Sequence, residues 1–249
     1  MKKAVIYSYN GAGASMRHLS RFLDDAPILT RHNLSETELR NKVLINYGAS
    51  YLTVWSPGWL NPPDKIKNAV DKLLTFELCN RNNVPITVFT HSTETVKNWL
   101  QDGKQVYVRA TSTGSEGHGI SILNNRQQPI PSAAFYSQAL NHNDEYRVHV
   151  VNSQIVSIGC KYKKEPKANK WIRNMDNGWA FRLNIEAPVA VRQAGLQAVI
   201  AIGLDFGAAD VAYCQEENKA YVLEVNSAPT MSETTALAYG NAFRAYLRG

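Results

Sequence analysis

The alternation of hydrophobic and polar positions divides the chain into short strands and amphipathic helices. Apolar runs bounded by turn residues predict strands at 4–8, 43–47, 86–89, 106–109, 120–123, 133–140 and 145–150. Apolar residues that recur at helical spacing predict helices at 16–23, 66–78, 188–202 and 231–247. Strands interleaved with helices in this way indicate a protein of the α/β or α+β class.

The segment 204–230 carries the strongest pattern in the chain. Its strand-like runs 210–214 and 220–226 flank the polar loop 215–219, which is typical of an antiparallel hairpin. Symmetric closure of that loop predicts three pairs of facing residues: Cys214 with Ala220, Ala212 with Val222, and Asp210 with Glu224. The hairpin would therefore bring two carboxylates together.

Two facing carboxylates destabilise a sheet, so this pairing makes sense mainly with a cation between them. Strand alternation adds Asn226 to the face of Glu224 and predicts an apolar opposite face, formed by Tyr221, Leu223 and Val225. A set of ligands that offers only oxygen suits Mg²⁺. A single acid here would more often be a solvent-facing strand residue, but the complete string favours a metal site.

The same string resembles the metal-binding end of the ATP-grasp family. The family pattern is a glycine-leucine-aspartate approach, a valine-aspartate-like strand and a leucine-glutamate-valine-asparagine strand. This chain has Gly203-Leu204-Asp205-Phe206, then Asp210-Val211, then Leu223-Glu224-Val225-Asn226. The resemblance implies an ATP-grasp fold in which Asp210, Glu224 and Asn226 bind Mg²⁺, with Mn²⁺ as an alternative ion.

Two cationic residues and a glycine-rich loop follow the family pattern for the ATP phosphates. The segment 70–74 resembles the ATP-grasp segment whose aspartate-lysine pair starts a helix, which implies that Lys72 binds phosphate. Arg109 occupies the strand position where the family often has a lysine. The loop 110–119 matches the phosphate-covering loop, which implies contacts from Ser115, Gly117 and Gly119. Without the resemblance, Lys72 would be a solvated helix residue and the loop a flexible surface hairpin.

The strand 133–140 and the strand after it resemble the adenosine-binding part of the family. The resemblance implies that the main chain of Gln138 and Leu140 binds adenine and that Glu145 reaches the ribose. Alternation puts Glu145, Arg147 and His149 on one strand face. Taken alone, that face would be a wet sheet surface with an internal ion pair.

The segment 161–182 is polar, basic and aromatic, and its proline, asparagine and glycine residues predict a long loop or irregular flap. Its two tryptophans argue against disorder. Arg173-Asn174 is similar to an arginine-asparagine element that lies near the transferred phosphate in peptide-modifying glutamate ligases. The resemblance therefore implies catalytic roles for Arg147, Arg173 and Asn174, and nucleotide binding by Lys161.

Composition excludes several other classes of protein. The 249 residues are 44% hydrophobic and 19% charged, and no apolar run is long enough to span a bilayer. The N-terminal apolar run is too short for a signal peptide, so we expect a cytoplasmic protein. The three cysteines show neither metal-ligand spacing nor a disulfide framework. The net charge of +6 comes from scattered residues, which fits anionic phosphates as well as nucleic acid.

The N-terminal part fits the family only loosely. The glycine-containing loop 10–14 fails as a dinucleotide fingerprint, although its N–H groups could bind a carboxylate or phosphate; a plain tight turn is the alternative. The proline-rich segment 55–63 predicts a lobe boundary. We therefore expect a short α/β lobe at 1–63 and an ATP-grasp domain at 64–249, whose two α+β lobes, 64–134 and 135–249, grip ATP.

The resemblance implies a carboxylate-amine ligase that converts ATP to ADP and phosphate through an acylphosphate. A short N-terminal lobe leaves the acceptor site open, and the basic flap beside it suits a peptide or protein acceptor. A ligase of small metabolites, completed by a homodimer, is one alternative. An inactive nucleotide-binding regulatory or scaffold module is another, and a nucleic-acid binder is disfavoured. Compact chains of this type also occur among bacteriophage proteins.

Overall fold

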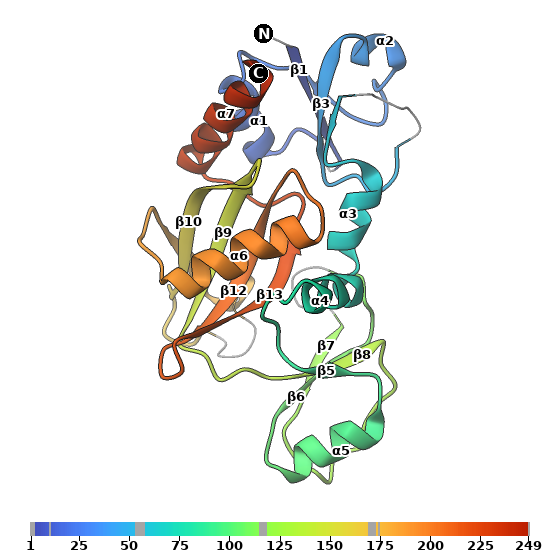
Figure 1. Cartoon of the computed structure of the whole chain (residues 1–249), viewed down its shortest axis with the longest axis vertical. Helices are drawn as coiled ribbons and strands as arrows, with labels where there is room; N and C mark the ends of the chain where they lie inside the picture. The colour runs from blue at the N-terminus through green and yellow to red at the C-terminus, as the bar shows by residue number, and fades with distance from the viewer. Residues whose placement is uncertain are drawn as a thin grey trace.

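The computed structural model describes residues 3–9, 11–52, 58–114, 119–168, 173 and 175–248. Over these residues the chain forms three β-sheets that follow one another along the long axis of the molecule (Figure 1). A parallel N-terminal sheet lies at one end, a large antiparallel sheet in the middle and a small antiparallel sheet at the other end. The predicted mixture of α/β and α+β structure is confirmed.

The N-terminal sheet has the strand order β2-β1-β3-β4, formed by β1 (Lys3–Ser8), β2 (Ile28–Leu29), β3 (Lys42–Tyr47) and β4 (Trp59–Leu60). One face, with Ala4 and Ile6, packs against α1 (Ala14–Arg21) and α7 (Glu233–Arg248). The other face, with Val5 and Tyr7, packs near α2 (Glu36–Leu39). A strand that is covered on both faces is apolar throughout, which explains the unbroken apolar run of β1 at the centre of this sheet.

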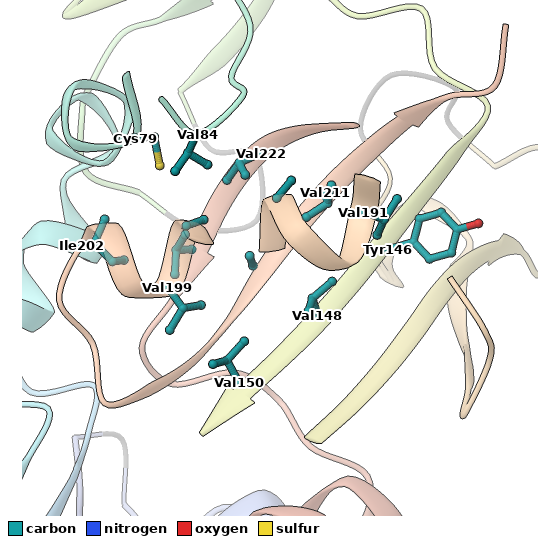
Figure 2. Close-up of a cluster of buried hydrophobic side chains, with 14 of the residues drawn as sticks. Cys79, Val84, Tyr146, Val148, Val150, Val191, Val199, Ile202, Val211 and Val222 are labelled. Carbon is teal, nitrogen blue, oxygen red and sulfur yellow. The ribbon is translucent and has the colours of Figure 1, made fainter. Parts of the chain in front are cut away.

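The large sheet has the order β11-β10-β9-β12-β13. Its strands are β9 (Asp144–Val151), β10 (Gln154–Lys163), β11 (Trp179–Leu183), β12 (Phe206–Cys214) and β13 (Lys219–Asn226), with a short 3₁₀ helix, η1 (Met175–Asn177), before β11. Helix α6 (Val189–Ala201) crosses one face and buries Val191 and Val199 against Val148 and Val211 (Figure 2). The core under α6 leaves the opposite face of the sheet for polar chemistry.

The small sheet has the order β5-β8-β6-β7, formed by β5 (Phe89–Thr90), β6 (Val106–Arg109), β7 (Ile120–Leu123) and β8 (Phe135–Gln138). Helix α5 (Thr93–Gln101) covers it through Val96 and Leu100. β8 pairs with β6, so this sheet extends to Gln138. The lobe boundary at residue 134 stays a prediction.

The predicted helix 66–78 is two helices, α3 (Pro63–Val70) and α4 (Lys72–Arg81). Asp71 breaks them because its backbone is extended and its Oδ1 accepts hydrogen bonds from the N–H groups of Leu73 and Leu74 at 3.0 and 3.1 Å. Lys72 therefore starts a helix, as the family pattern implied. Its position at the first turn directs it toward the large sheet rather than into solvent.

The expectation that 161–182 forms one long loop is wrong at both ends. Lys161 and Lys163 belong to β10 and pair with Phe181 and Trp179 of β11. Aromatic residues at 179 and 181 fit a strand as well as a loop, and the strand pairing decides between them. The three cysteines are free, as expected. None of the helices in the described ranges has both the length and the apolar character needed to cross a membrane.

Candidate active site

The hairpin of β12 and β13 pairs Asp210 with Glu224, as predicted. The other two predicted pairs are wrong: the structure pairs Ala212 with Tyr221 and Cys214 with Lys219. Lys219 joins β13, which leaves 215–218 as the loop and shifts the register by one residue. A β-bulge next to Asp210 shifts the register back.

The bulge also decides which way Glu224 points. Its extra residue is Leu223, because Val222 pairs with Val211 while Glu224 pairs with Asp210. Val222 lies in the core under α6 before the bulge, and Val225 lies there after it. A regular strand would put Glu224 on the face of Val222, inside the core. The predicted apolar face is therefore only partly correct: Val225 lies in it, but Ala220 and Val222 replace Tyr221 and Leu223.

Arg147 and Lys161 surround the buried carboxylate of Asp210. Arg147 Nε and Nη2 donate to Oδ1 and Oδ2 at 2.7 and 2.8 Å, and Lys161 Nζ lies 3.6 Å from Oδ2. Burial alone would raise the pKa of Asp210, but the attraction of Arg147 and Lys161 outweighs burial and lowers it. Asp210 is therefore held ionised on the polar face of the sheet.

Glu224 is the more accessible acid, with 33% of its side chain exposed. Asn226 Nδ2 donates to its Oε1 at 3.2 Å, and Lys72 Nζ lies 3.6 Å from its Oε2. No cluster of three or more His, Cys, Asp and Glu side chains suited to a metal exists among the described residues, so the candidate set is two acids and one amide. Paired carboxylates beside an amide oxygen fit Mg²⁺.

Glu145 lies in a second buried cluster of charges next to Asp210. Its Oε1 is 2.7 Å from His142 Nε2 and 3.5 Å from Arg173 Nε, and its Oε2 accepts from Lys161 Nζ at 2.8 Å. Burial alone would raise the pKa of Glu145. The interactions with His142 and Lys161 outweigh burial, so the pKa of Glu145 lies below its ordinary value. Lys161 thus bridges the predicted ribose acid and the predicted metal acid.

The end of β8 and the segment after it carry the main-chain groups that are predicted to bind adenine. The Gln138 N–H donates to Val88 O at 3.0 Å, and Thr87 Oγ1 donates to Gln138 O at 2.8 Å. Both main-chain groups of Gln138 are therefore occupied. The Leu140 N–H makes no hydrogen bond with another described residue, while His142 Nδ1 lies 3.1 Å from Leu140 O.

Arg109 is buried between two aromatic rings at the end of β6. Its guanidinium carbon lies 5.5 Å from the centre of the Phe76 ring and 5.4 Å from that of Phe135. Its Nε is buried and has no hydrogen-bond partner in the described part of the chain. Burial lowers the pKa of Arg109, although attraction by Glu224 opposes this. A cation left without a full set of acceptors suits an anionic ligand.

The glycine-rich loop is described only at its two ends. Lys72 Nζ donates to the Gly114 carbonyl, so the loop begins beside the acids. Gly119 has a φ of +74°, which favours glycine, and its carbonyl accepts from the Ala110 N–H at 2.9 Å. Ser115, Gly117 and Asn174, predicted to contact nucleotide or substrate, lie outside the described residues.

A cavity of about 610 Å³ extends from Glu224 to the N-terminal lobe. Its lining includes Glu224 and Lys72 at one end and the loop between β1 and α1, with Gly11 and Ser15, at the other. Lys72 and Glu224 are its charged side chains among the described residues. Sequence reasoning missed this cavity because residues far apart in the chain line it. It also missed His142, because a lone histidine three residues before Glu145 matches no recognisable pattern.

No protein-family model matches the chain. Tetrahydromethanopterin:α-L-glutamate ligase of Methanocaldococcus jannaschii is 25% identical over 234 residues, 86% of this chain and 76% of that protein. The ATP-grasp ligase PsnB, complexed with minimal precursor, Mg and ADP, is 13% identical with a TM-score of 0.72, over 98% of this chain and 97% of that one. D-alanine–D-alanine ligase from Bacillus anthracis is 12% identical with a TM-score of 0.66, over 100% and 98%. The chain therefore has the ATP-grasp fold, as its hairpin motif predicted.

Proposed function

We propose that this chain is an ATP-dependent carboxylate-amine ligase that releases ADP and phosphate. The observation that carries the proposal is the pairing of Asp210 with Glu224 on a sheet face that also holds Arg147 and Lys161, with Lys72 beside Glu224. Acids that could share a metal, next to cations that could bind phosphate, suit phosphoryl transfer.

In this proposal, the residues around the metal and the phosphates have separate roles. Asp210, Glu224 and Asn226 would hold Mg²⁺, which when bound neutralises phosphate charge and aligns the terminal phosphate for transfer. The complex of PsnB with Mg and ADP supports both cofactors. Lys72 and Arg109 would bind the phosphates. Arg147 keeps Asp210 ionised and oriented, since it occupies both carboxylate oxygens.

The reaction needs no nucleophile from the protein. A carboxylate oxygen of the acceptor attacks the terminal phosphorus of ATP, and ADP leaves with the electrons of the broken bond. The amine then attacks the acyl carbon of the acylphosphate, loses a proton and expels phosphate. The chain's own residues contribute charge, orientation and exclusion of water from the acylphosphate.

The acceptor is a peptide or protein in this proposal, and the charge of the cavity supports that choice. A free amino acid carries an ammonium group, but the far end of the cavity offers serine, glycine and tyrosine residues and no carboxylate among its described lining. A peptide nitrogen is uncharged and needs no such partner. The precursor peptide bound to PsnB supports the same class. D-alanine–D-alanine ligase and the tetrahydromethanopterin ligase keep small-molecule acceptors as the second candidate.

The test is to incubate the chain with ATP, Mg²⁺, the amino acids and a set of peptides, and to follow phosphate release and product masses. We expect phosphate release that requires an acid and an amine together, with a peptide gaining the mass of the amine less water. Joining of two free amino acids, with all peptides unchanged, would leave the ligase and refute the peptide acceptor. Nucleotide binding without phosphate release for any acid and amine would favour an inactive regulatory module.

A further inference from the structure

Arg173 lies beside the backbone that follows β8, the segment proposed to bind adenine. Its Nη1 and Nη2 donate to the carbonyls of Asn143 and His142, each at 3.0 Å, and its Nε lies 3.5 Å from Glu145 Oε1. The guanidinium carbon also lies 4.8 Å from the centre of the Trp179 ring. Only 7% of the side chain is exposed. These contacts use the forked shape of the guanidinium on two neighbouring carbonyls and one carboxylate.

The side chains of Arg173 and His142 restrict which main-chain groups between residues 139 and 143 are available to a ligand. The carbonyls of Leu140, His142 and Asn143 accept bonds from these two side chains, and Cys214 Sγ donates to the Asn141 carbonyl at 3.3 Å. The N–H groups of residues 139 and 143 donate to other parts of the backbone. One carbonyl, that of residue 139, and the N–H groups of residues 140, 141 and 142 make no hydrogen bond with other described residues.

That set of groups matches adenine better than guanine. The adenine edge offers an amino donor beside a ring-nitrogen acceptor, which needs one carbonyl and one N–H. Guanine has a carbonyl oxygen in place of the amino group and two neighbouring donors, so it needs more than one carbonyl acceptor. Carbonyls already bound by a charged guanidinium are poor partners for those donors.

We propose that Arg173 is a positioning and base-specificity residue, which holds the 139–143 backbone in the form that accepts adenine and excludes guanine. This inference rests on the proposed nucleotide-binding function and replaces the catalytic role at the transferred phosphate that the sequence resemblance implied for Arg173. The same side chain holds Glu145, so it orients the base-binding backbone and the ribose acid together.

The test compares three ligands on the full chain by calorimetry: MgADP, MgGDP and inorganic tripolyphosphate with Mg²⁺. The variants are Arg173→Gln, Arg173→Lys and, as a matched control, Arg182→Gln, which removes an exposed arginine of β11. In Arg173→Gln we expect MgADP to bind about tenfold or more weakly, because charge-assisted hydrogen bonds are lost. The preference for ADP over GDP falls, and tripolyphosphate affinity stays within about twofold.

Arg173→Lys keeps the charge beside Glu145, but a lysine cannot donate to two carbonyls at once as the forked guanidinium does. We therefore expect its ADP affinity to lie between those of the parent and Arg173→Gln. It also decides the outcome if circular dichroism shows that Arg173→Gln does not fold. Equal losses of ADP and tripolyphosphate would place Arg173 at the phosphates and overturn the proposal, as would unchanged ADP affinity and base preference. A parent chain that binds none of the three ligands would refute the proposed function itself.

Discussion

Burial distinguishes the two acids of the hairpin. Asp210 has 4% of its side chain exposed and both oxygens bound by Arg147, whereas Glu224 is one-third exposed. Removing the charge of Asp210 would leave the buried guanidinium of Arg147 without its carboxylate partner, so a loss of activity in such a variant could come from unfolding. Glu224 is the residue at which chemistry can be tested separately.

Glu224→Gln should abolish phosphate transfer while the protein stays folded. The substitution keeps the size of the side chain and removes the charge that a magnesium ion would need, so we expect kcat to fall by roughly a hundredfold or more. The free energy of unfolding should change by less than about 1 kcal/mol, since the group is partly exposed. Glu217→Gln, in the loop of the same hairpin, is the matched control. Parental turnover in Glu224→Gln would disprove the metal assignment.

Close packing between elements places the site strands. Helix α6 approaches the large sheet at Gly195, where an added Cβ would lie 2.6 Å from the Val148 Cβ. β9, which carries Val148, also carries Glu145 and Arg147 on its polar face. The position of α6 is therefore tied to the position of the site side chains.

Gly195→Ala should destabilise the protein even though alanine is the better helix former. Alanine would gain about 1 kcal/mol of helix propensity, but the clash with Val148 costs about 1–3 kcal/mol or more. We expect a net loss in the free energy of unfolding, measured by urea denaturation. Val148→Ala should cost less stability in the Gly195→Ala background than in the parent, because it removes the two methyl groups that lie 2.7 and 2.9 Å from the added Cβ. Additive effects of the two substitutions would contradict direct contact.

At the scale of the whole molecule, α7 joins the N-terminal sheet to the large sheet. Tyr239 of α7 donates to the Gly207 carbonyl at 2.9 Å, so its oxygen accepts from His149 Nδ1 at 3.1 Å. Phe206 and Phe243 pack beside them in the core that both sheets share. Burial, with repulsion from Arg147, lowers the pKa of His149 to about 3. The contact between α7 and the large sheet therefore contains a neutral histidine.

Stability should fall as pH decreases below the ordinary pKa of histidine. The folded chain keeps His149 neutral down to a pKa of about 3, whereas the unfolded chain takes up a proton below about 6.5. Stability from this group is therefore full above about pH 6.5 and is lost toward pH 3, at about 1.4 kcal/mol per pH unit. Urea unfolding measured at pH 7 and at pH 5 gives the free energy of unfolding that each protein loses between these pH values. We expect that loss to be about 2 kcal/mol smaller in His149→Asn than in the parent. Equal losses in both would contradict a buried neutral histidine.

The sequence by itself determined the features that depend on local order. The hairpin motif and the uninterrupted apolar strand of the N-terminal lobe could be recognised because neighbouring residues form them. The helix start at Asp71-Lys72 was implied by the family resemblance, since periodicity alone predicted one helix over 66–78. The pairing of Asp210 with Glu224 was also predicted, although the loop is shorter than expected and a bulge restores the register. Strand register depends on loop length and bulges, which alternation alone does not encode.

Only the tertiary structure decided how the charges are distributed among their partners. His142, Lys161 and Arg173 meet at Glu145 although they lie on different segments, and Arg173 also donates to the His142 carbonyl in the segment proposed to bind adenine. The cavity next to Glu224 likewise needs the N-terminal lobe to form its far wall. Such contacts depend on how sheets and helices pack in three dimensions, and burial and pKa shifts follow from that packing rather than from any local pattern.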